Sequence, residues 1–415
     1  MLGQLQKSLL LSLLMTSFTA QGLTLHEAFH LAKQNTSRIQ NSILDEEISQ
    51  AEKRQVSTTL FPRLSVISNN TWRDEVGGSG VVSSFGRRYQ HTAQVTLKQP
   101  LFQGGAEYNL LKAARRYPEI AQWSRQQEEV DLYADLAKAF YEYLTAQADQ
   151  NTLKEQMALL DQRIKYLNSR VKIGRSKKTE LYSARSQKAR ISAEIELQKN
   201  KILAAEEELM RLTGLQQISN IQDPLATSSD WETQYPGHHL EETPKYQAAK
   251  LVVEQSRYEA RAAKGSYWPG VDLTGNYYLD RAGVLTNSKW DVSVVANWEL
   301  YSGGASKAGV RIKALQLRKL ELEFTDLKRN QFLNYNRIKR SFQIKVSESK
   351  KLGIAIKAAE RNYQEHLRES RLGLVSDLDV LRALDEHLMI KRTFSRSHYQ
   401  AKAFFWKLRQ AAGIR

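Results

Sequence analysis

The sequence predicts a mainly α-helical protein with a β-barrel part, in which long coiled-coil hairpins and four transmembrane β-strands form an internal duplication. The glycine pairs Gly104–Gly303, Gly174–Gly373 and Gly214–Gly413 each lie 199 positions apart. A constant shift over this length indicates a repeated structural unit. Only 21 glycines and 7 prolines occur in 415 residues, which favours long uninterrupted elements.

Each repeat is expected to contain a lead-in helix, two strands, a long helix and a return helix. In the first repeat, 23–214, we expect strands at about 62–76 and 87–101, a long helix over 105–173 and a return helix over 178–213. In the second, 245–415, the strands are expected at about 270–281 and 289–300, the long helix over 304–372 and the return helix over 376–412. Residues 215–244, which contain Pro224, Pro236 and Gly237, are the expected equatorial linker.

The helical segments have the spacing of coiled coils. Apolar residues near the first turn between helices step by four and three: Leu153, Met157, Leu160, Ile164, Leu167 and Val171. This heptad pattern predicts packing of neighbouring long helices. Pro118 has Leu317 as its counterpart in the second repeat, so we expect a kink in the first long helix only.

The N-terminus indicates export. Residues 1–22 combine Lys7, an apolar stretch and the small residues Ala20 and Gly22, which predicts a signal peptide cleaved after Gly22. The chain has no cysteine, which excludes disulfides, a cysteine nucleophile and Cys-ligated metal. Beyond the signal peptide no apolar run approaches the ~20 residues of a spanning helix.

Each of the four expected strands has one apolar face and one face that carries mostly polar residues. Such strands suit lipid on one face and water on the other, and open sheet edges are not tolerated in lipid. Three chains would supply about twelve strands, enough for an aqueous lumen. The predicted lumen-facing residues are Thr92, Gln94, Thr96, Asp272, Thr274, Asn276, Asp291, Asn297 and Glu299. A soluble sheet packed on the helices has the same alternation and remains the alternative at this point.

Several motifs together resemble the TolC family of outer-membrane efflux proteins. They are the opening segment Leu23 to Ala28, the corners Leu101 to Gly105 and Leu300 to Gly304, and the repeated helix-strand-strand-helix plan. The resemblance implies a trimeric channel-tunnel in the bacterial outer membrane, with a large periplasmic portion. It also implies partners: outer-membrane lipid, a periplasmic adaptor (membrane fusion protein) and, through it, an inner-membrane transporter used for efflux or type I secretion.

The same resemblance assigns roles to the two turns between helices. It implies adaptor docking at Arg170, Ile173, Gly174, Arg175, Leu181, Leu372, Gly373, Leu374 and Val380. It implies a periplasmic gate at Asp379, Arg382 and Glu180, where Arg382 stands in the second of the family's two acidic positions. A mixed Asp/Arg ring could close by salt bridges, whereas solvated side chains without a gating role are an equal alternative for Arg382. The basic stretch from Arg170 to Lys178 either is simply solvated or steers an acidic adaptor tip.

Other functions leave weaker signals. His26-Glu27-Ala28-Phe29-His30 matches the zinc-protease pattern, but no third ligand stands nearby, so we expect no metal. The net charge of +16 is spread over both repeats without a nucleic-acid-binding module, so we expect no nucleic acid. The sequence contains no phosphate-binding loop and no nucleophile with a paired base. We therefore expect neither catalysis nor a bound cofactor. The main rival is a soluble periplasmic coiled-coil structural or adaptor protein with no pore, and the exported substrate stays open.

Overall fold

The computed structural model describes residues 23–72, 74, 89–218, 221–223, 225, 230–233, 236–237, 239–281 and 287–414. The chain divides into two compact units. One comprises the chain up to Asn41, Gln126–Thr243 and the chain from Asn330 onwards. The other comprises Ser42–Arg125 and Pro244–Arg329. The expected signal peptide lies outside the described residues.

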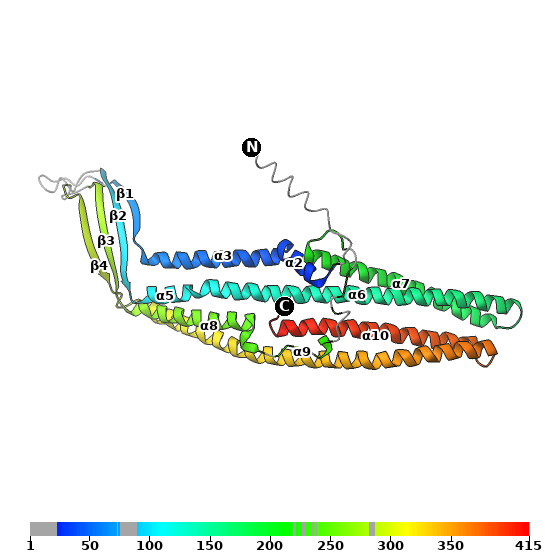
Figure 1. Ribbon diagram of the computed structural model, residues 1–415. Helices are drawn as coiled ribbons and strands as arrows, with labels where there is room; N and C mark the ends of the chain where they lie inside the picture. Colours follow the sequence, from blue (N-terminus) through cyan, green and yellow to red (C-terminus); the bar gives the residue numbers. More distant parts are fainter. Residues whose placement is uncertain are drawn as a thin grey trace. The chain divides into compact units, whose positions relative to one another are not determined.

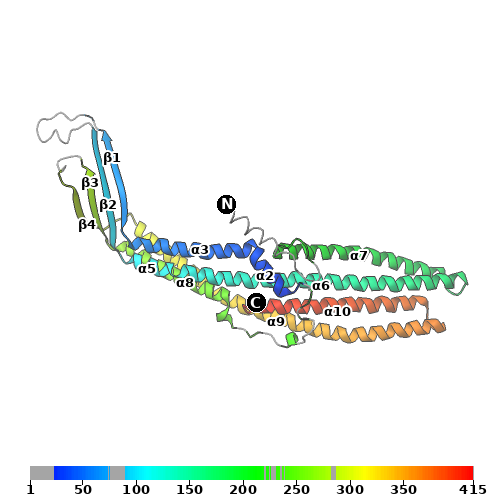
Figure 2. The same cartoon turned by 45° about the horizontal axis from the view of Figure 1, so that its top comes forward.

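The first unit is helical. Its main elements are α2 (Leu25–Asn35), most of α6 (Arg116–Lys172), α7 (Lys178–Thr213), the later part of α9 (Ala305–Leu372) and α10 (Asp377–Ala411). Both views show α7 beside α6 and α10 beside α9, so that two antiparallel hairpins lie side by side (Figures 1 and 2). Short 3₁₀ turns, η3 (Asp230–Glu232) and η4 (Leu240–Glu242), interrupt the segment between α7 and α8.

The heptad residues form the core of the first hairpin. Leu153, Leu160 and Leu167 of α6 are fully buried, and they pack in one cluster with Leu181 and Ile191 of α7. Leucines at this spacing fill one seam between two helices. A second cluster around Phe342 and Phe405 joins α9 to α10. Packing along these seams, and not intrinsic helix propensity, stabilises helices with so few apolar residues.

The second unit contains the sheet. Its elements are the main part of α3 (Ser37–Ser57), η2 (Thr58–Leu60), β1 (Arg63–Trp72), β2 (Tyr89–Gln103), α5 (Ala106–Ala114), α8 (Pro244–Ala263), η5 (Lys264–Tyr267), β3 (Gly270–Asp280) and β4 (Trp290–Asn297). The strands form one antiparallel sheet in the order β1-β2-β3-β4 (Figure 1). The fold class predicted for a single chain, long helices with a four-stranded antiparallel sheet, is therefore confirmed.

Two helix breaks distinguish the first repeat from the second. The first long helix is interrupted at Arg115, between α5 and α6, whereas α9 is continuous. Pro118 explains the break, because it has no N–H to donate to the carbonyl of Ala114 and its ring crowds that carbonyl. The lead-in helix of the first repeat is also broken, at Thr36 between α2 and α3. There the Thr36 hydroxyl donates to the carbonyl of Leu212 at 3.0 Å, which fixes the break against α7.

Candidate functional site

The sheet has one polar face that is linked by side-chain hydrogen bonds. Ser65, Thr96, Asn276 and Asp291 lie opposite one another across the four strands. Thr96 Oγ1 donates to Asn276 Oδ1 at 2.8 Å, and Asn276 Nδ2 donates to Asp291 Oδ1 at 2.9 Å. Lys98 and Asp272 form an ion pair of 2.8 Å on the same face. A connected polar row of this kind is suited to contact with water.

The opposite face of the sheet is apolar and exposed. Val66, Val95, Tyr277 and Trp290 form one row across the four strands. Val66 is 73% exposed, Trp290 67% and the neighbouring Val292 61%. A soluble sheet of this composition would bury these side chains against helices. The strand edges of β1 and β4 have no partner strand among the described residues.

The residues predicted to face a lumen divide into two groups. Thr96, Thr274, Asn276, Asp272 and Asp291 lie on the polar face by register, and Gln94 Nε2 donates to Thr96 Oγ1 at 3.2 Å. Thr92 lies opposite Asn69, beyond a register shift at Ala93, and Asn297 lies opposite Gly270 at the end of β4. Glu299 lies two residues beyond β4, so the strand ends earlier than we expected.

The two turns between helices have the same backbone. Gly174 has φ +72° and Gly373 has φ +80°, values that favour glycine. Arg175 N donates to the carbonyl of Arg170 at 2.9 Å, and Leu374 N donates to that of Glu369 at 3.0 Å. Both hairpins therefore reverse through a Schellman-type turn. We call residues 170–181 the first turn-round and residues 369–380 the second turn-round.

The residues that resemblance assigned to docking differ in exposure. Ile173, Leu372 and Leu374 are 65%, 75% and 72% exposed, which leaves apolar side chains at both turn-rounds uncovered. Leu181 and Val380 are only 6% and 2% exposed. These two side chains pack inside the hairpins, where they support the turns.

The acidic residues of the expected gate act as helix caps. Asp379 accepts from Ser376 Oγ at 2.6 Å and from Ser376 N at 3.3 Å, which completes a capping box at the start of α10. The hydrogen bond from the Ser376 side chain is the main reason that the pKa of Asp379 lies below its usual value. Glu180, the counterpart in α7, accepts from the Ser176 hydroxyl and from Lys177 N. Arg382 is 73% exposed and lies 3.7 Å from Asp379.

Sequence reasoning missed the buried ion pair of Arg163 and Asp377. The pair joins α6 to the first residue of α10, and Ser370 Oγ donates to Asp377 Oδ1 at 2.8 Å. Burial lowers the pKa of Arg163. The two partners are 214 residues apart in the sequence, so no local motif could predict the pair. This contact holds the second hairpin against the first beside the turn-rounds.

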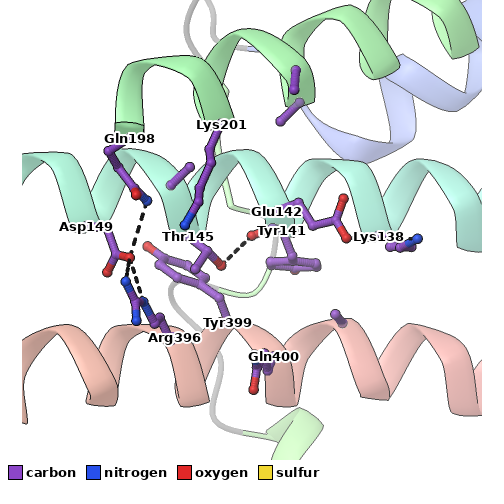
Figure 3. A pocket seen from close by; sticks show the side chains of 14 residues that line it. Lys138, Tyr141, Glu142, Thr145, Asp149, Gln198, Lys201, Arg396, Tyr399 and Gln400 are labelled. Atoms are coloured by element: carbon purple, nitrogen blue, oxygen red, sulfur yellow. Dashed lines mark hydrogen bonds and ion pairs between the residues drawn. The ribbon is translucent and has the colours of Figure 1, made fainter. Parts of the chain in front are cut away.

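A second buried carboxylate, Asp149, joins three helices. Figure 3 shows it between Gln198 of α7 and Arg396 of α10. Arg396 Nε donates to Asp149 Oδ2 at 2.6 Å, and Gln198 Nε2 donates to the same oxygen at 3.3 Å. The adjoining hollow has a volume of about 450 Å³ and is open to solvent. Its charged groups of both signs are mostly engaged with one another, so we assign it to the joint between the hairpins.

The zinc-protease pattern does not form a metal site in the described part of the chain. The rings of His26 and His30 are 4.8 Å apart, but no third ligand joins them in the described residues. Glu27 instead caps α2, where it accepts from Thr24 N at 2.9 Å. The Thr24 hydroxyl also donates to Glu27, at 2.9 Å. The two hydrogen bonds from Thr24 lower the pKa of Glu27. Among the described residues, no helix is long and apolar enough to traverse a membrane.

An exposed apolar sheet face, a hydrogen-bonded polar face and paired helical hairpins define the class of outer-membrane channel proteins. The model of the outer membrane efflux protein family matches residues 28–215. A relative, the proteases secretion protein PrtF of Dickeya chrysanthemi, is 22% identical over 95% of this chain and 89% of its own. The first repeat of the chain thus matches the outer membrane efflux protein family, and a relative that is named for secretion matches over nearly the whole length.

Solved structures show the same fold over nearly the whole chain. CusC superposes with a TM-score of 0.84 at 15% identity, covering 96% of both chains. VceC of Vibrio cholerae superposes with a TM-score of 0.83 at 16% identity, covering 94% of this chain and 96% of its own. The shared fold thus extends into the second repeat, beyond the residues that the family model matches. Together with the family match of the first repeat, this fold is similar to that of outer-membrane channel proteins.

Proposed function

We propose that three copies of this chain form an exit channel that passes substrates from an inner-membrane pump, through a periplasmic adaptor, to the cell exterior. The observation that carries the proposal is the four-stranded sheet, which has an exposed apolar face and, among the described residues, two edges without a partner strand. Unpaired backbone groups are costly in lipid, so the edges must close on those of other copies. Three sheets would give a barrel of about twelve strands.

Exposed apolar residues on the helices support the same assembly. Leu44 and Ile48 of α3 are 53% and 54% exposed, and Ile312, Leu315 and Leu322 of α9 are 53–56% exposed. Each set follows helical spacing and therefore forms a stripe. Contiguous exposed apolar stripes mark sites of association. Packing of one copy's helices on the next would cover them and build a helical tube.

We infer that residues 1–22 are a cleaved signal peptide, that 215–244 is the equatorial linker between repeats, and that the chain has no catalytic role of its own. Asp379 with Arg382 and Glu180 would narrow the periplasmic entrance, and the exposed residues of both turn-rounds would contact the adaptor. The relative named for protease secretion supports polypeptide cargo among the possible substrates.

Planar-bilayer recording of the purified protein, together with its native mass, tests this function. The proposal predicts a detergent-requiring trimer that produces stepwise conductance. A monomer that stays in solution without detergent and carries no current would instead establish a soluble periplasmic coiled-coil protein. Zinc content, measured on the same sample, checks the expectation that His26 and His30 bind no metal.

A further inference from the structure

The segment between α7 and α8, residues 214–243, joins the two hairpins, and we call it the connecting segment. Asp223 Oδ1 accepts from Tyr141 OH of α6 at 3.0 Å, and Asp223 Oδ2 accepts from Lys402 Nζ of α10. Trp406 Nε1, also of α10, donates to the same tyrosine oxygen at 3.3 Å. One carboxylate of the connecting segment therefore holds a helix of each hairpin.

The ion pair of Asp223 and Lys402 is shielded from water by aromatic rings. The two side chains are only 10% and 3% exposed. Lys402 Nζ lies 5.9 Å from the centroid of the Trp231 ring and 5.7 Å from that of the Tyr399 ring. Because water screens the attraction between two charges, the strength of this pair depends on the rings that cover it.

Trp231 fixes the connecting segment to the second hairpin. The side chain is buried, and its ring centroid lies 6.1 Å from that of Phe342 in α9 and 6.4 Å from that of Phe405 in α10. The same ring meets His398 of α10 edge to face, at 5.9 Å. A titratable group thus lies directly against the residue that seats the segment.

The described carboxylates near His398 are already paired with cations. Burial is the main cause that lowers the pKa of His398, and Lys402, one helical turn further along α10, lowers this pKa as well. Asp223 and Glu232 of the connecting segment act in the opposite direction. Asp223 is paired with Lys402, however, and Glu232 with Lys350 of α9 at 2.9 Å.

The remaining neighbours of His398 are aromatic. Phe394 is stacked on the His398 ring with a centroid distance of 5.7 Å, and the titratable Tyr399 lies edge to face with it at 5.8 Å. A positive charge on His398 can therefore regain water only if Trp231 moves away from the ring. Movement of Trp231 would also expose the ion pair that it covers.

We propose that the connecting segment is a latch that acid releases: it holds the two hairpins together while His398 is neutral, and it detaches when His398 is protonated. In the detached segment the imidazole has its ordinary pKa of about 6.5, so this form binds more protons than the seated one. The latch is therefore complete above about pH 6.5 and weakens as the pH falls below that value.

Release of the latch needs only one chain, whereas its effect on transport rests on the proposed function. Asp223 joins α6 of the first hairpin to α10 of the second. Loss of this contact leaves the hairpins free to shift against each other. In an assembled channel whose tube is built from these hairpins, we expect acid to raise the conductance.

Hydrogen exchange of the full-length chain in nanodiscs tests the latch. Gln222 N donates to the carbonyl of Leu23 at 3.1 Å, and Leu225 N donates to Asp223 Oδ1 at 2.9 Å, so both amides report whether the segment is seated. After correction for the intrinsic rate, their exchange at pH 5.5 should be up to about tenfold faster than at pH 7.5. This factor is the ratio of protonated to neutral imidazole one unit below its ordinary pKa. Single-channel conductance is recorded at the same two pH values and should rise in acid.

Two variants remove the titrating group. His398→Phe keeps a ring against Trp231, and His398→Gln keeps a polar side chain without the charge. Each should lose the acid response of exchange and of conductance. The matched control is His387→Phe on the same helix, because the ring of His387 is stacked with Tyr363 instead. This control should keep the acid response of the Gln222 and Leu225 amides.

Three results overturn the latch: exchange of the two amides that does not respond to pH in the unchanged chain, an equal response in the His398 variants, or loss of the response in His387→Phe. Faster exchange in acid that requires His398, in a chain that forms no pore, supports the latch and contradicts the proposed function. The two failures are thereby distinguished.

Discussion

Arg163 and Asp377 form an ion pair whose side chains are only 10% and 6% exposed, although 214 residues separate them in the sequence. The pair lies where α10 begins, and Arg163 also donates to Ser370 Oγ at 3.1 Å at the end of α9. One buried guanidinium therefore contacts both ends of the second turn-round. The loss of stability on mutation of a buried ion pair depends on whether one partner or both are replaced.

Replacement of Arg163 alone should loosen the second hairpin. The substitution Arg163→Ala leaves Asp377 buried without its cation, at a cost of about 3–5 kcal/mol. We expect faster proteolysis at the second turn-round and a larger single-channel conductance. Limited proteolysis and planar-bilayer recording measure the two effects.

The double variant R163M/D377L is the control for this prediction. It replaces both charges with apolar side chains, so no unpaired charge stays buried and most of the lost protection should be recovered. If Arg163→Ala leaves proteolysis and conductance unchanged, the pair does not hold the hairpins together.

Two substitutions at Asp379 separate its capping role from a gating role. Asp379→Asn keeps an oxygen that accepts from Ser376 N but removes the charge, whereas Asp379→Ala removes both. If Asp379 belongs to a charged ring at the entrance, Asp379→Asn is already sufficient to shift the cation-to-anion permeability ratio, by about twofold or more. Reversal potentials in asymmetric salt measure this ratio. A change with Ala and none with Asn would identify Asp379 as a cap only.

The hairpin formed by α9 and α10 should weaken in mild acid. Burial lowers the pKa of His387, and the charged groups near it are Glu360, Lys391 and Glu155. Its ring is stacked with that of Tyr363, and the two ring centroids are 6.4 Å apart. The unfolded chain then binds more protons than the folded one, so stability is complete above about pH 6.5 and falls as the pH drops through the folded-state pKa. Hydrogen exchange of α10 amides between pH 7.5 and 5 should show the loss.

His387→Phe is the matched variant for this pH effect, because it keeps the ring contact and removes the titrating group. Its α10 amides should show a flatter pH dependence than those of the unchanged chain. Some dependence should remain, since burial also lowers the pKa of His398. An identical pH profile in the two proteins would show that His387 is not responsible.

Two adjacent residues of β4 test which face of the sheet meets lipid. Val292 belongs to the apolar face and Ser293 to the polar face, and both are exposed in one chain. Val292→Lys should cost about 2–4 kcal/mol near the bilayer midplane. Ser293→Lys should be tolerated in a water-filled lumen. Folding yield into lipid vesicles measures both, and equal tolerance of the two lysines would contradict the orientation of the sheet.

The sequence carried strong signals for the repeated elements. The 199-residue shift, the heptads of Leu153 to Val171 and the strict alternation around Thr96 are local or periodic features, so the fold class could be predicted from them. The break before Pro118 followed from the geometry of proline. The break at Thr36 carried no such signal, because it depends on a contact with Leu212 far along the chain.

The contacts that organise the turn-rounds could not be predicted in the same way. Arg163, Asp377 and Ser370 come from three different helices, and Asp149 meets Arg396 across 247 residues. Such pairs depend on how hairpins pack, and a single sequence contains no periodic trace of that packing. The burial of Leu181 and Val380 could not be predicted for a related reason, since only the packed hairpin shows that they face inward.

The most direct test of the central claim is a disulfide between the two outer strands, β1 and β4. The chain has no cysteine, and within one sheet these strands lie three interstrand spacings apart, about 14 Å, which is too far for a disulfide. Cysteines are placed along the apolar faces at Val66 and, in a panel of registers, at Val292 and Val294, and membranes are oxidised. The account predicts a covalent trimer that still conducts, whereas chains that stay monomeric on a denaturing gel at every register would contradict it.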